Sequence, residues 1–433
     1  MVKKKGELKK TINKKLLIIL IFFFIFNIYL FNKGFHDWDV SAQQSWGNLA
    51  LEHGLPYLYI EGYTDYPPLY LYVLKFNSWF ALNFFGNNVP GNDQYVFISK
   101  IVPMLAILLT GLILFFYLRK KDYEIAIFGM ILYLFNLALI YNASYWGQVD
   151  SVAALFSFLS ILFLINKKYV FSTFFLTLAI LTKFQSVVLI PVIGIVILLN
   201  SNYKNWFKCF FFSLFTFLII FLPYIISRTF TEAFIISFSP LDNYRRVTVN
   251  AFNLWYILSP TAPDWRNTLR DTNLFLGFSF KLWGLFFLAI YTLFVVYQLI
   301  KKMGSKNILF ASASMVFAFF MLPTQIHERH LFPFFALLLL VFMIERKFLW
   351  IYITMSITYL LNLMIVFPVN KGVFVFYQMQ LIINFIISIL SMKGFTMIIA
   401  LINIFVFIYF SKEGILKGLL SNLKKDFVEF KKW

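Results

Sequence analysis

Long apolar runs recur along this chain and leave few folds open to it. A helix needs about 20 apolar residues to cross a bilayer, and most of the runs come close to that length. Hydrophobic residues make up 61% of the sequence and charged residues 13%, against roughly 45–50% and 25% in a soluble domain. A soluble enzyme, a disordered chain and a disulfide scaffold are thereby excluded. The sequence predicts an all-α, polytopic transmembrane helical bundle with about 13 spans, at residues 16–32, 96–118, 123–141, 151–166, 169–182, 184–199, 207–226, 273–300, 307–322, 331–344, 348–367, 373–391 and 395–410.

We expect one transmembrane domain over residues 1–410 and an amphipathic basic tail over residues 411–433. The first apolar run follows a lysine-rich stretch, as in a signal peptide. No small-x-small cleavage site comes after it, so we expect it to be retained as a span. The tail carries leucine and phenylalanine on one helical face with lysine between them, which is typical of a helix on a membrane surface. Thirteen spans would place this tail outside, and the sequence leaves open whether one span is miscounted.

Residues 66–85 are apolar enough to resemble a further span, but we expect them to form a helix that lies at the interface. The segment opens with Pro67-Pro68 and carries Lys75 and Asn77. Counting it as a span would also move the basic cluster at 119–121 to the outer side. We therefore assign it to a long first outer loop over residues 33–95, and we expect a later outer loop over residues 227–272.

The formal net charge of +19 reports topology once the charges are sorted by side. With the N-terminus inside, twenty basic and four acidic residues fall in inner segments, whereas outer segments carry twelve of each. Lysine and arginine are enriched in the cytoplasmic loops of membrane proteins. The pattern predicts a multi-pass protein of the cell membrane that contacts membrane lipids and binds no nucleic acid.

The outer segments hold the residues from which a functional site can be built. The candidates are Asp37, Asp39, Gln43, Trp46, Asp65, Tyr66, Gln148, Asp150, Lys183, Gln185, His327, Glu328, Arg329 and His330. Structural explanations stay open for several of them. Asp150 suits a helix N-cap, Lys183 suits a side chain that snorkels to the interface, and the stretch 327–330 suits a structural ion pair.

Taken together, these residue types predict an outward-facing pocket at the membrane surface. A carboxylate can accept the proton of an incoming hydroxyl group. Lysine, arginine and histidine can stabilise a phosphate group as it leaves. The set suits a substrate whose phosphate is anchored in lipid.

Six short stretches, in this order, resemble the polytopic GT-C glycosyltransferases, which take a sugar from a polyprenyl-phosphate carrier. They are Asp39 with Ala42-Gln43 and Trp46, Asp65-Tyr66-Pro67-Pro68-Leu69, Trp146-Gly147-Gln148-Val149-Asp150, Lys183-Phe184-Gln185, Asn250-Ala251-Phe252-Asn253-Leu254-Trp255 and His327-Glu328-Arg329. The chain is most similar to prokaryotic mannosyltransferase-like proteins related to the GPI second mannosyltransferase. It also resembles the alpha-1,3-glucosyltransferases that extend dolichol-linked oligosaccharide. The likeness covers residues 34–335.

The resemblance implies a GT-C-like fold and transfer of a hexose, mannose or glucose, with inversion. The donor would be a polyprenyl-phosphate-linked sugar, and transfer would occur on the extracytoplasmic face. Asp39 would be the catalytic base, and Lys183, Arg329 and His327 would bind the donor phosphate. The other candidates would line the sugar or acceptor pocket. The acceptor stays open among glycan, lipid-linked and protein acceptors.

Two positions depart from the family pattern. His330 stands where the family usually has tyrosine. Asp37-Trp38-Asp39 forms an Asp-x-Asp pair of the kind that binds a divalent cation in distant members. No further carboxylate cluster accompanies the pair, so we expect no cofactor, with a metal at Asp37 and Asp39 as the alternative.

A transporter or lipid flippase is the main alternative function, because many spans and intramembrane charges suit transport too. Transporters more often place charges at mid-depth within helices, whereas here the first outer loop is long and polar. A glycan polymerase or ligase would concentrate its function in one large later loop. We therefore expect an integral-membrane glycosyltransferase of the cell envelope.

Overall fold

The computed structural model describes residues 2–31, 33–35, 37–61, 64–86, 93–238, 244–368 and 377–416, and it is built almost entirely of helices. Short 3-10 and π segments are labelled η. The first half of the chain forms α1 (Val2–Phe31), α2 (Asp37–His53), α3 (Tyr57–Ile60), α4 (Pro68–Phe85), α5 (Asp93–Leu118), α6 (Tyr123–Leu134), α7 (Leu137–Ile140), η1 (Tyr141–Trp146), α8 (Asp150–Ile165), α9 (Tyr169–Thr182), η2 (Phe184–Leu189) and α10 (Ile190–Asn200).

The second half continues the helical pattern with one small sheet. It forms α11 (Tyr203–Ile226), α12 (Phe230–Phe238), η4 (Leu254–Ile257), η5 (Trp265–Asn267), α13 (Phe280–Lys301), α14 (Ser305–Met321), η6 (Glu328–Leu331), α15 (Phe334–Ile344), η7 (Arg346–Phe348), α16 (Leu349–Val366), α17 (Tyr377–Leu390), α18 (Lys393–Ser411) and η8 (Lys412–Leu416). The antiparallel strands β1 (Leu274–Phe275) and β2 (Phe278–Ser279) pair just after the later outer loop, at the start of the predicted run 273–300, whose helix α13 begins only at Phe280. The expectation of an all-α architecture is confirmed.

Local sequence signals set where several helices begin and end. α4 begins at Pro68 directly after Pro67, because the first turn of a helix needs no N–H from that residue. It ends at Gly86, whose φ of 64° is the left-handed conformation that closes many helices. The side chain of Asp122 accepts a hydrogen bond from the N–H of Ile125 at 2.8 Å and caps α6. These signals fix both ends of α4 and the start of α6.

Six helices of the described chain are long and apolar enough to cross a membrane, and seven if the bent pair over residues 123–146 is one span. Four further apolar helices are shorter, at 10–17 residues. Each of the thirteen predicted runs contains a helix, but thirteen spans are not confirmed. The structure therefore supports a membrane-spanning helical protein. An apolar run alone does not separate a span from a helix buried among other helices.

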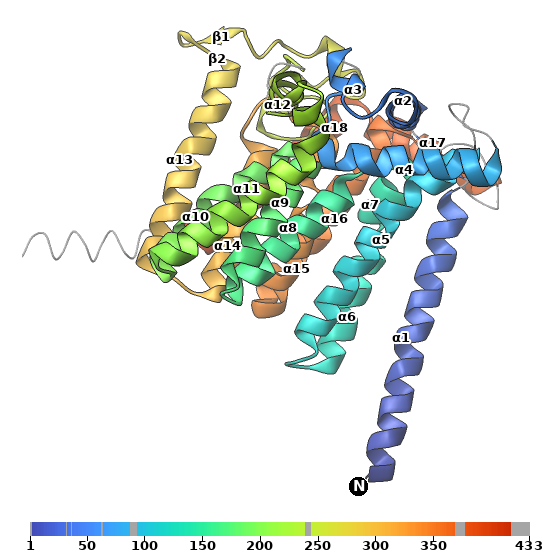
Figure 1. The fold of residues 1–433 in the computed structure, drawn as a ribbon, viewed down its shortest axis with the longest axis vertical. Helices are drawn as coiled ribbons and strands as arrows, with labels where there is room; N and C mark the ends of the chain where they lie inside the picture. The colour runs from blue at the N-terminus through green and yellow to red at the C-terminus, as the bar shows by residue number, and fades with distance from the viewer. Residues whose placement is uncertain are drawn as a thin grey trace, which may run out of the picture.

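The two ends of the bundle carry different elements (Figure 1). α2, α4 and the β1–β2 hairpin lie together at one end, which we call the loop end. The N-terminal end of α1 and the turn between α5 and α6 lie at the opposite end, which we call the basic end because Arg119, Lys120 and Lys121 stand there. α4 runs across the direction of α1 and α5 (Figure 1), and it is not among the helices that qualify as spans. Residues 66–85 are thus not a candidate span, as predicted.

The segment between α16 and α18 corrects the prediction for residues 373–391. The chain leaves α16 at the loop end, where the ring of Phe367 packs on Trp146 with centroids 5.3 Å apart. α18 begins at the same end, because Ile399 and Phe252 of the later outer loop share a hydrophobic cluster. The end of α16 and the start of α18, the helices on either side of α17, therefore lie at the same end of the bundle. An apolar helix that covers the end of a bundle has the same hydropathy as one that crosses it, so the sequence alone could not separate the two.

The C-terminal tail begins at the basic end. Lys347 Nζ lies 2.7 Å from Glu413 Oε2, and Met343, just before Lys347, packs near Gly129 of α6. The tail thus shares the end that carries the basic clusters, as its own charge favours. Lys393 is one of the twenty basic residues that the sequence analysis counted in inner segments. It lies at the loop end instead, because it starts α18. The amphipathic helix predicted for the tail falls mostly in residues 417–433, outside the described residues.

The later outer loop is anchored to the bundle by asparagine side chains. Asn362 of α16 donates a hydrogen bond to the carbonyl of Asn250 at 2.8 Å and accepts one from the N–H of Phe252 at 3.1 Å. Asn403 of α18 donates to the carbonyl of Phe252 at 2.9 Å. Buried backbone groups need partners, and these amides supply them where the chain is irregular. The motif that starts at Asn250 therefore has a structural role at the loop end.

Single-cysteine labelling tests the placement of the two ends. We expect Arg119→Cys and Lys412→Cys to react with a membrane-impermeant maleimide from one side and Arg266→Cys from the other, because these exposed side chains lie at opposite ends. The native Cys209 is buried and sets the background. Reaction of Lys412→Cys from the same side as Arg266→Cys would contradict the assignment of α17.

Candidate functional site

Asp39 lies in the first turn of α2 and contacts the stretch that follows η1. Its Oδ2 accepts a hydrogen bond from Trp146 Nε1 at 2.8 Å and another from Gln148 Nε2 at 2.6 Å. Arg329 Nη1 lies 3.8 Å from the same oxygen, which is an ion-pair distance and too long for a hydrogen bond. Three groups therefore orient this carboxylate, while 25% of the side chain stays exposed.

The local conformation after η1 makes these contacts possible. The π turn ends in Gly147, whose φ of 92° is left-handed and costs glycine no strain. A Cβ at Gly147 would lie 3.2 Å from Val40 Cγ2, so the absence of a side chain also lets α2 approach closely. π turns are rare in helices and occur frequently at functional sites. The glycine thus places Trp146 and Gln148 on the same carboxylate.

Asp150 and Lys183 form a buried ion pair. Lys183 stands at the break between α9 and η2, and its Nζ donates to Asp150 Oδ1 at the start of α8. The Asp150 side chain has no exposed surface, and that of Lys183 is 12% exposed. Asn142 Nδ2 donates to the second carboxylate oxygen, Oδ2, at 3.4 Å. Two buried charges are tolerated here because each compensates the other and both are hydrogen-bonded.

Arg329 in η6 lies between two carboxyl groups. Its Nη1 is 3.3 Å from Glu328 Oε1 and, as above, close to Asp39. The carbonyl of Arg329 accepts a hydrogen bond from Tyr359 of α16 at 3.2 Å. Burial raises the pKa of Glu328 to about 7. Burial opposes the charge of Arg329, but Asp39 and Glu328 outweigh it and raise the pKa of the guanidinium. Arg329 is thus a permanent cation beside one group that titrates near neutral pH.

His327 and His330 stay neutral beside these cations. Burial lowers the pKa of each well below its ordinary value, and Arg329 adds to the effect. The two rings have centroids 5.3 Å apart. Short backbone bridges from Val249 and Asn250 to His327 hold this stretch against the later outer loop. A neutral imidazole can donate one hydrogen bond to an anion without adding a charge to the site.

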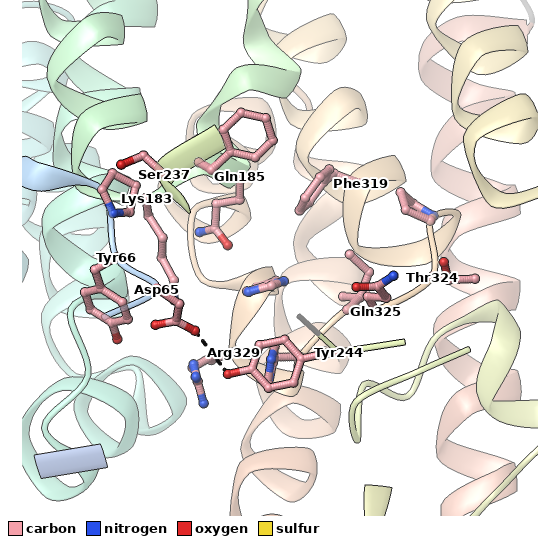
Figure 2. Close-up of a pocket in the computed structure, with 16 residues that line it drawn as sticks. Asp65, Tyr66, Lys183, Gln185, Ser237, Tyr244, Phe319, Thr324, Gln325 and Arg329 are labelled. Carbon is pink, nitrogen blue, oxygen red and sulfur yellow. Dashed lines mark hydrogen bonds between the residues drawn. The ribbon is translucent and has the colours of Figure 1, made fainter. Parts of the chain in front are cut away.

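Two adjoining cavities open around these residues and share a wall made of Asp65, Tyr66, Tyr244 and Arg329. In that wall Tyr244 OH donates to Asp65 Oδ2 at 3.2 Å (Figure 2). The narrow cavity, of about 120 Å³, is also lined by Pro67, Lys183, Phe184, Gln185, Ser237, Phe319, Pro323, Thr324, Gln325, Ile326, His327 and His330. The wide cavity, of about 620 Å³, is also lined by Trp38, Asp39, Ala42, Gln43, Trp46, Thr64 and Ile236.

Gln185 reaches into the narrow cavity, with Lys183 on one side and Phe319 on the other (Figure 2). Only 6% of Gln185 is exposed. Neither of its side-chain amide atoms has a hydrogen-bond partner among the residues that the structure describes. A buried amide without partners costs free energy, which a polar ligand would recover. Gln185 therefore points to a polar ligand group in this cavity.

The structure gathers most of the predicted residues but divides them between the cavities. The wide cavity alone is lined by Asp39, Gln43 and Trp46. The narrow cavity alone is lined by Lys183, Gln185, His327 and His330. Both cavities are lined by Asp65, Tyr66 and Arg329.

Gln148, Asp150 and Glu328, which the resemblance places in the sugar or acceptor pocket, line neither cavity in the described structure. They contact Asp39, Lys183 and Arg329 from behind and act as positioning residues. Asp37 is the fourth predicted residue that lines neither cavity in the described structure, and it is exposed at the start of α2. An acid there favours the positive end of the helix.

Three residues that the sequence analysis did not single out belong to this region. Trp38 and Tyr244 line the cavities. The position of Trp38 next to Asp39 was a signal in the sequence that it could belong to the site, whereas Tyr244 had no such signal. Lys100 is a fully buried lysine of α5 that donates to the carbonyls of Phe31, at 2.8 Å, and Gly34. A lysine within an apolar run was the available signal. It fastens the start of the first outer loop to α5.

Asp37 and Asp39 do not form a chelating pair. Residues two apart on a helix point to different faces, and Asp37 is exposed while Asp39 faces Trp146 and Gln148. Within the described parts of the chain there is no group of three or more His, Cys, Asp or Glu side chains that could hold a metal ion. The residues present therefore do not fit a metal held jointly by Asp37 and Asp39.

No protein-family model matches this chain, and no curated protein matches its sequence.

The Asp150–Lys183 pair can be tested by its effect on stability. Asp150→Asn keeps the shape of the side chain but leaves Lys183 without a counter-charge, so we expect a loss of about 3 kcal/mol. Adding Lys183→Met should restore most of that stability. Thermal unfolding of the purified protein measures each variant. A double variant as unstable as the sum of the two single variants would show that the charges do not interact.

Proposed function

We propose that this protein is an integral-membrane glycosyltransferase that moves a hexose, mannose or glucose, from a polyprenyl-phosphate carrier to an acceptor hydroxyl. The observation that carries the proposal is the position of Asp39. It is held by Trp146 and Gln148 on the wall of the wide cavity, next to Arg329, which also lines the narrow cavity. A general base and a phosphate-binding cation thus meet at the junction of two cavities. The GT-C resemblance of the same residues supports this assignment.

In this proposal the narrow cavity takes the donor phosphate. Lys183 and Arg329 supply positive charge there, and the neutral His327 and His330 supply hydrogen bonds. Phe184 and other apolar side chains of the lining suit the first carbons of a lipid carrier. The hexose would lie at the shared wall, within reach of Asp39, and the acceptor would enter the wide cavity.

The reaction needs one displacement at the anomeric carbon. The acceptor hydroxyl transfers its proton to Asp39 as its oxygen bonds to that carbon. The bond from the anomeric carbon to the phosphate oxygen breaks, and its electron pair leaves with the polyprenyl phosphate. Arg329 and Lys183 stabilise the negative charge that develops on the phosphate. Attack opposite the leaving group inverts the configuration, so no second carboxylate is required as a nucleophile.

The charge distribution supports an extracytoplasmic site in the cell membrane. The site lies at the loop end, opposite the basic clusters that mark the cytoplasmic side in membrane proteins. A transporter would use charges within its spans for its substrate. The buried Lys100 in α5 instead donates to two backbone carbonyls near the loop end. Its hydrogen bonds give it a structural role and do not favour transport.

Asp39→Asn tests the assignment of the base. The amide cannot accept the proton of the acceptor, so we expect hexose transfer to fall by roughly 10²–10⁴-fold while donor binding is retained. Asp37→Asn is the matched control, because Asp37 lies in the same helical turn but is exposed and lines neither cavity. Transfer is measured as release of polyprenyl phosphate from polyprenyl-phosphate mannose or glucose. Equal activity of the two variants would exclude Asp39 as the base.

The pKa of Glu328 predicts a pH dependence of donor affinity. Below pH 7 the carboxyl is protonated and leaves the charge of Arg329 to the donor; above it the carboxylate competes with the donor phosphate. Affinity should therefore fall as pH rises, roughly fivefold between pH 6 and 8 and roughly tenfold over the whole titration, if the competition is worth about 1.4 kcal/mol. Asp39 and Asp150 also face this group.

Glu328→Gln should flatten the pH profile, because the amide does not ionise. Equilibrium binding of the donor phosphodiester is the measurement, since that group keeps a single negative charge throughout this pH range. A profile that is as steep in Glu328→Gln as in the unmodified protein would assign the titration to another group.

A further inference from the structure

We propose that the β1–β2 hairpin is a membrane anchor whose partner is the lipid leaflet at the loop end. Four large apolar side chains belong to it: Leu274 and Phe275 in β1, Leu276 in the turn and Phe278 in β2. More than half of the surface of each is exposed, and the value reaches 75% at Leu276. An exposed apolar patch marks contact with a membrane or with another protein. The surroundings of the hairpin decide between these two, and they do so without reference to the proposed function.

The hairpin is held at the level of the first turn of α13, the candidate span that follows it. Trp283 Nε1 donates a hydrogen bond to the carbonyl of Phe275 at 2.8 Å. The ring centroids of Phe278 and Trp283 are 5.9 Å apart, and Phe275 stacks on Phe280 with centroids 6.1 Å apart. Tryptophan is enriched at the interface between membrane and water. The hairpin therefore lies where α13 enters the membrane.

The hairpin also continues the lipid-facing side of α13. Phe286 follows Trp283 after three residues, and their rings have centroids 5.8 Å apart. Leu293 follows Phe286 after seven residues, so the three side chains lie on one side of the helix. Phe286 is 50% exposed and Leu293 is 68% exposed, and exposed apolar side chains of a span face lipid. In Figure 1 the hairpin lies directly above α13, at the outer side of the bundle.

The turn of the hairpin carries a leucine where the backbone favours glycine. Leu276 has a φ of 50° and Gly277 a φ of 84°, and both values are left-handed. Glycine adopts this conformation without strain, whereas a leucine does not. Hairpin turns with two left-handed residues are usually Asn-Gly or Gly-Gly. Because Leu276 is also the most exposed of the four side chains, burial within the protein offsets little of the strain, and transfer into lipid would offset more.

Two features favour lipid over another protein or a second copy of this chain. Leu274 and Phe275 are neighbours in one strand, so their side chains point to opposite faces, and both are exposed. A protein partner would cover one face, whereas a fluid lipid phase surrounds both. Each strand also has only two residues, which leaves little edge for pairing with a strand of another chain.

Fluorescence quenching of the full chain in nanodiscs tests the proposal. Bimane is attached to Leu276→Cys in a Cys209→Ala background, and the quenchers are a lipid with a nitroxide on its acyl chain and iodide in the water. Phe286→Cys, on the lipid-facing side of α13, and Arg266→Cys, exposed in the later outer loop, are the references. We expect the nitroxide lipid to quench Leu276→Cys as strongly as Phe286→Cys and roughly threefold more strongly than Arg266→Cys, with the reverse order for iodide.

Either of two results would overturn the proposal. Quenching of Leu276→Cys by iodide to the extent seen in Arg266→Cys would place the hairpin in water. Protection from both quenchers would show that another protein segment or a second copy covers it. Leu274→Cys repeats the measurement at a second position of the hairpin, and the unfolding temperature of each labelled protein verifies that the variants fold.

Discussion

The two hydrogen bonds from Trp146 and Gln148 to Asp39 tie the first outer loop to the helical bundle, and the site depends on them. α2 packs closely against α4, where Gly47 lies next to Leu74 and Ser78. The two hydrogen bonds add the connection between α2 and the stretch after η1. The donors come from a turn that ends in a left-handed glycine, which lets both reach one oxygen atom. Two residues further on, Asp150 pairs with Lys183. One short stretch of chain therefore sets the positions of Asp39 and Lys183, the proposed base and a proposed phosphate-binding cation, together.

The sequence predicts the membrane class, the helical architecture and the end of the bundle where the site lies, because hydropathy and charge act on whole segments. It also predicts that Asp39, Lys183 and Arg329 belong to one region. It does not predict which side chains face a cavity. Gln148 and Asp150 belong to one motif that the sequence analysis assigned to the pocket. Both side chains lie behind the cavity walls, because their directions depend on the π turn before them. No sequence pattern for that turn is evident, and the sequence analysis assigned both residues to the pocket.

Residues 373–391 show the same limit at the level of a whole segment. The packing of Phe367 on Trp146 places the end of α16 at the loop end, and the ion pair between Lys347 and Glu413 places the start of α16 beside the end of α18. Residues 373–376 of the predicted run lie outside the described residues. Hydropathy treats such a segment as a span, because lipid and protein interior are equally apolar. The positive charge of the C-terminal tail already indicated that one predicted span was too many. A basic tail on the outer side conflicts with the enrichment of lysine and arginine on the inner side, and removing one crossing resolves the conflict.

The two cations of the site differ in how firmly their carboxylates hold them, and this difference bears on how a phosphate can bind. A buried cation needs a counter-ion when the site is empty, but a tight counter-ion competes with the ligand. Lys183 is hydrogen-bonded to Asp150, which is fully buried and has no other cation within ion-pair distance in the described chain. Lys183 is therefore held in place by Asp150, and the pair presents a fixed dipole with no net charge.

Arg329 contacts Asp39 at 3.8 Å, beyond hydrogen-bond distance, and its Nε has no hydrogen-bond partner within the described residues. Its other carboxylate, Glu328, can be neutralised by a proton near pH 7. Arg329 can thus turn to a phosphate with little loss. When it does, Asp39 keeps its hydrogen bonds from Trp146 and Gln148, so a move of Arg329 toward a phosphate leaves this carboxylate in position.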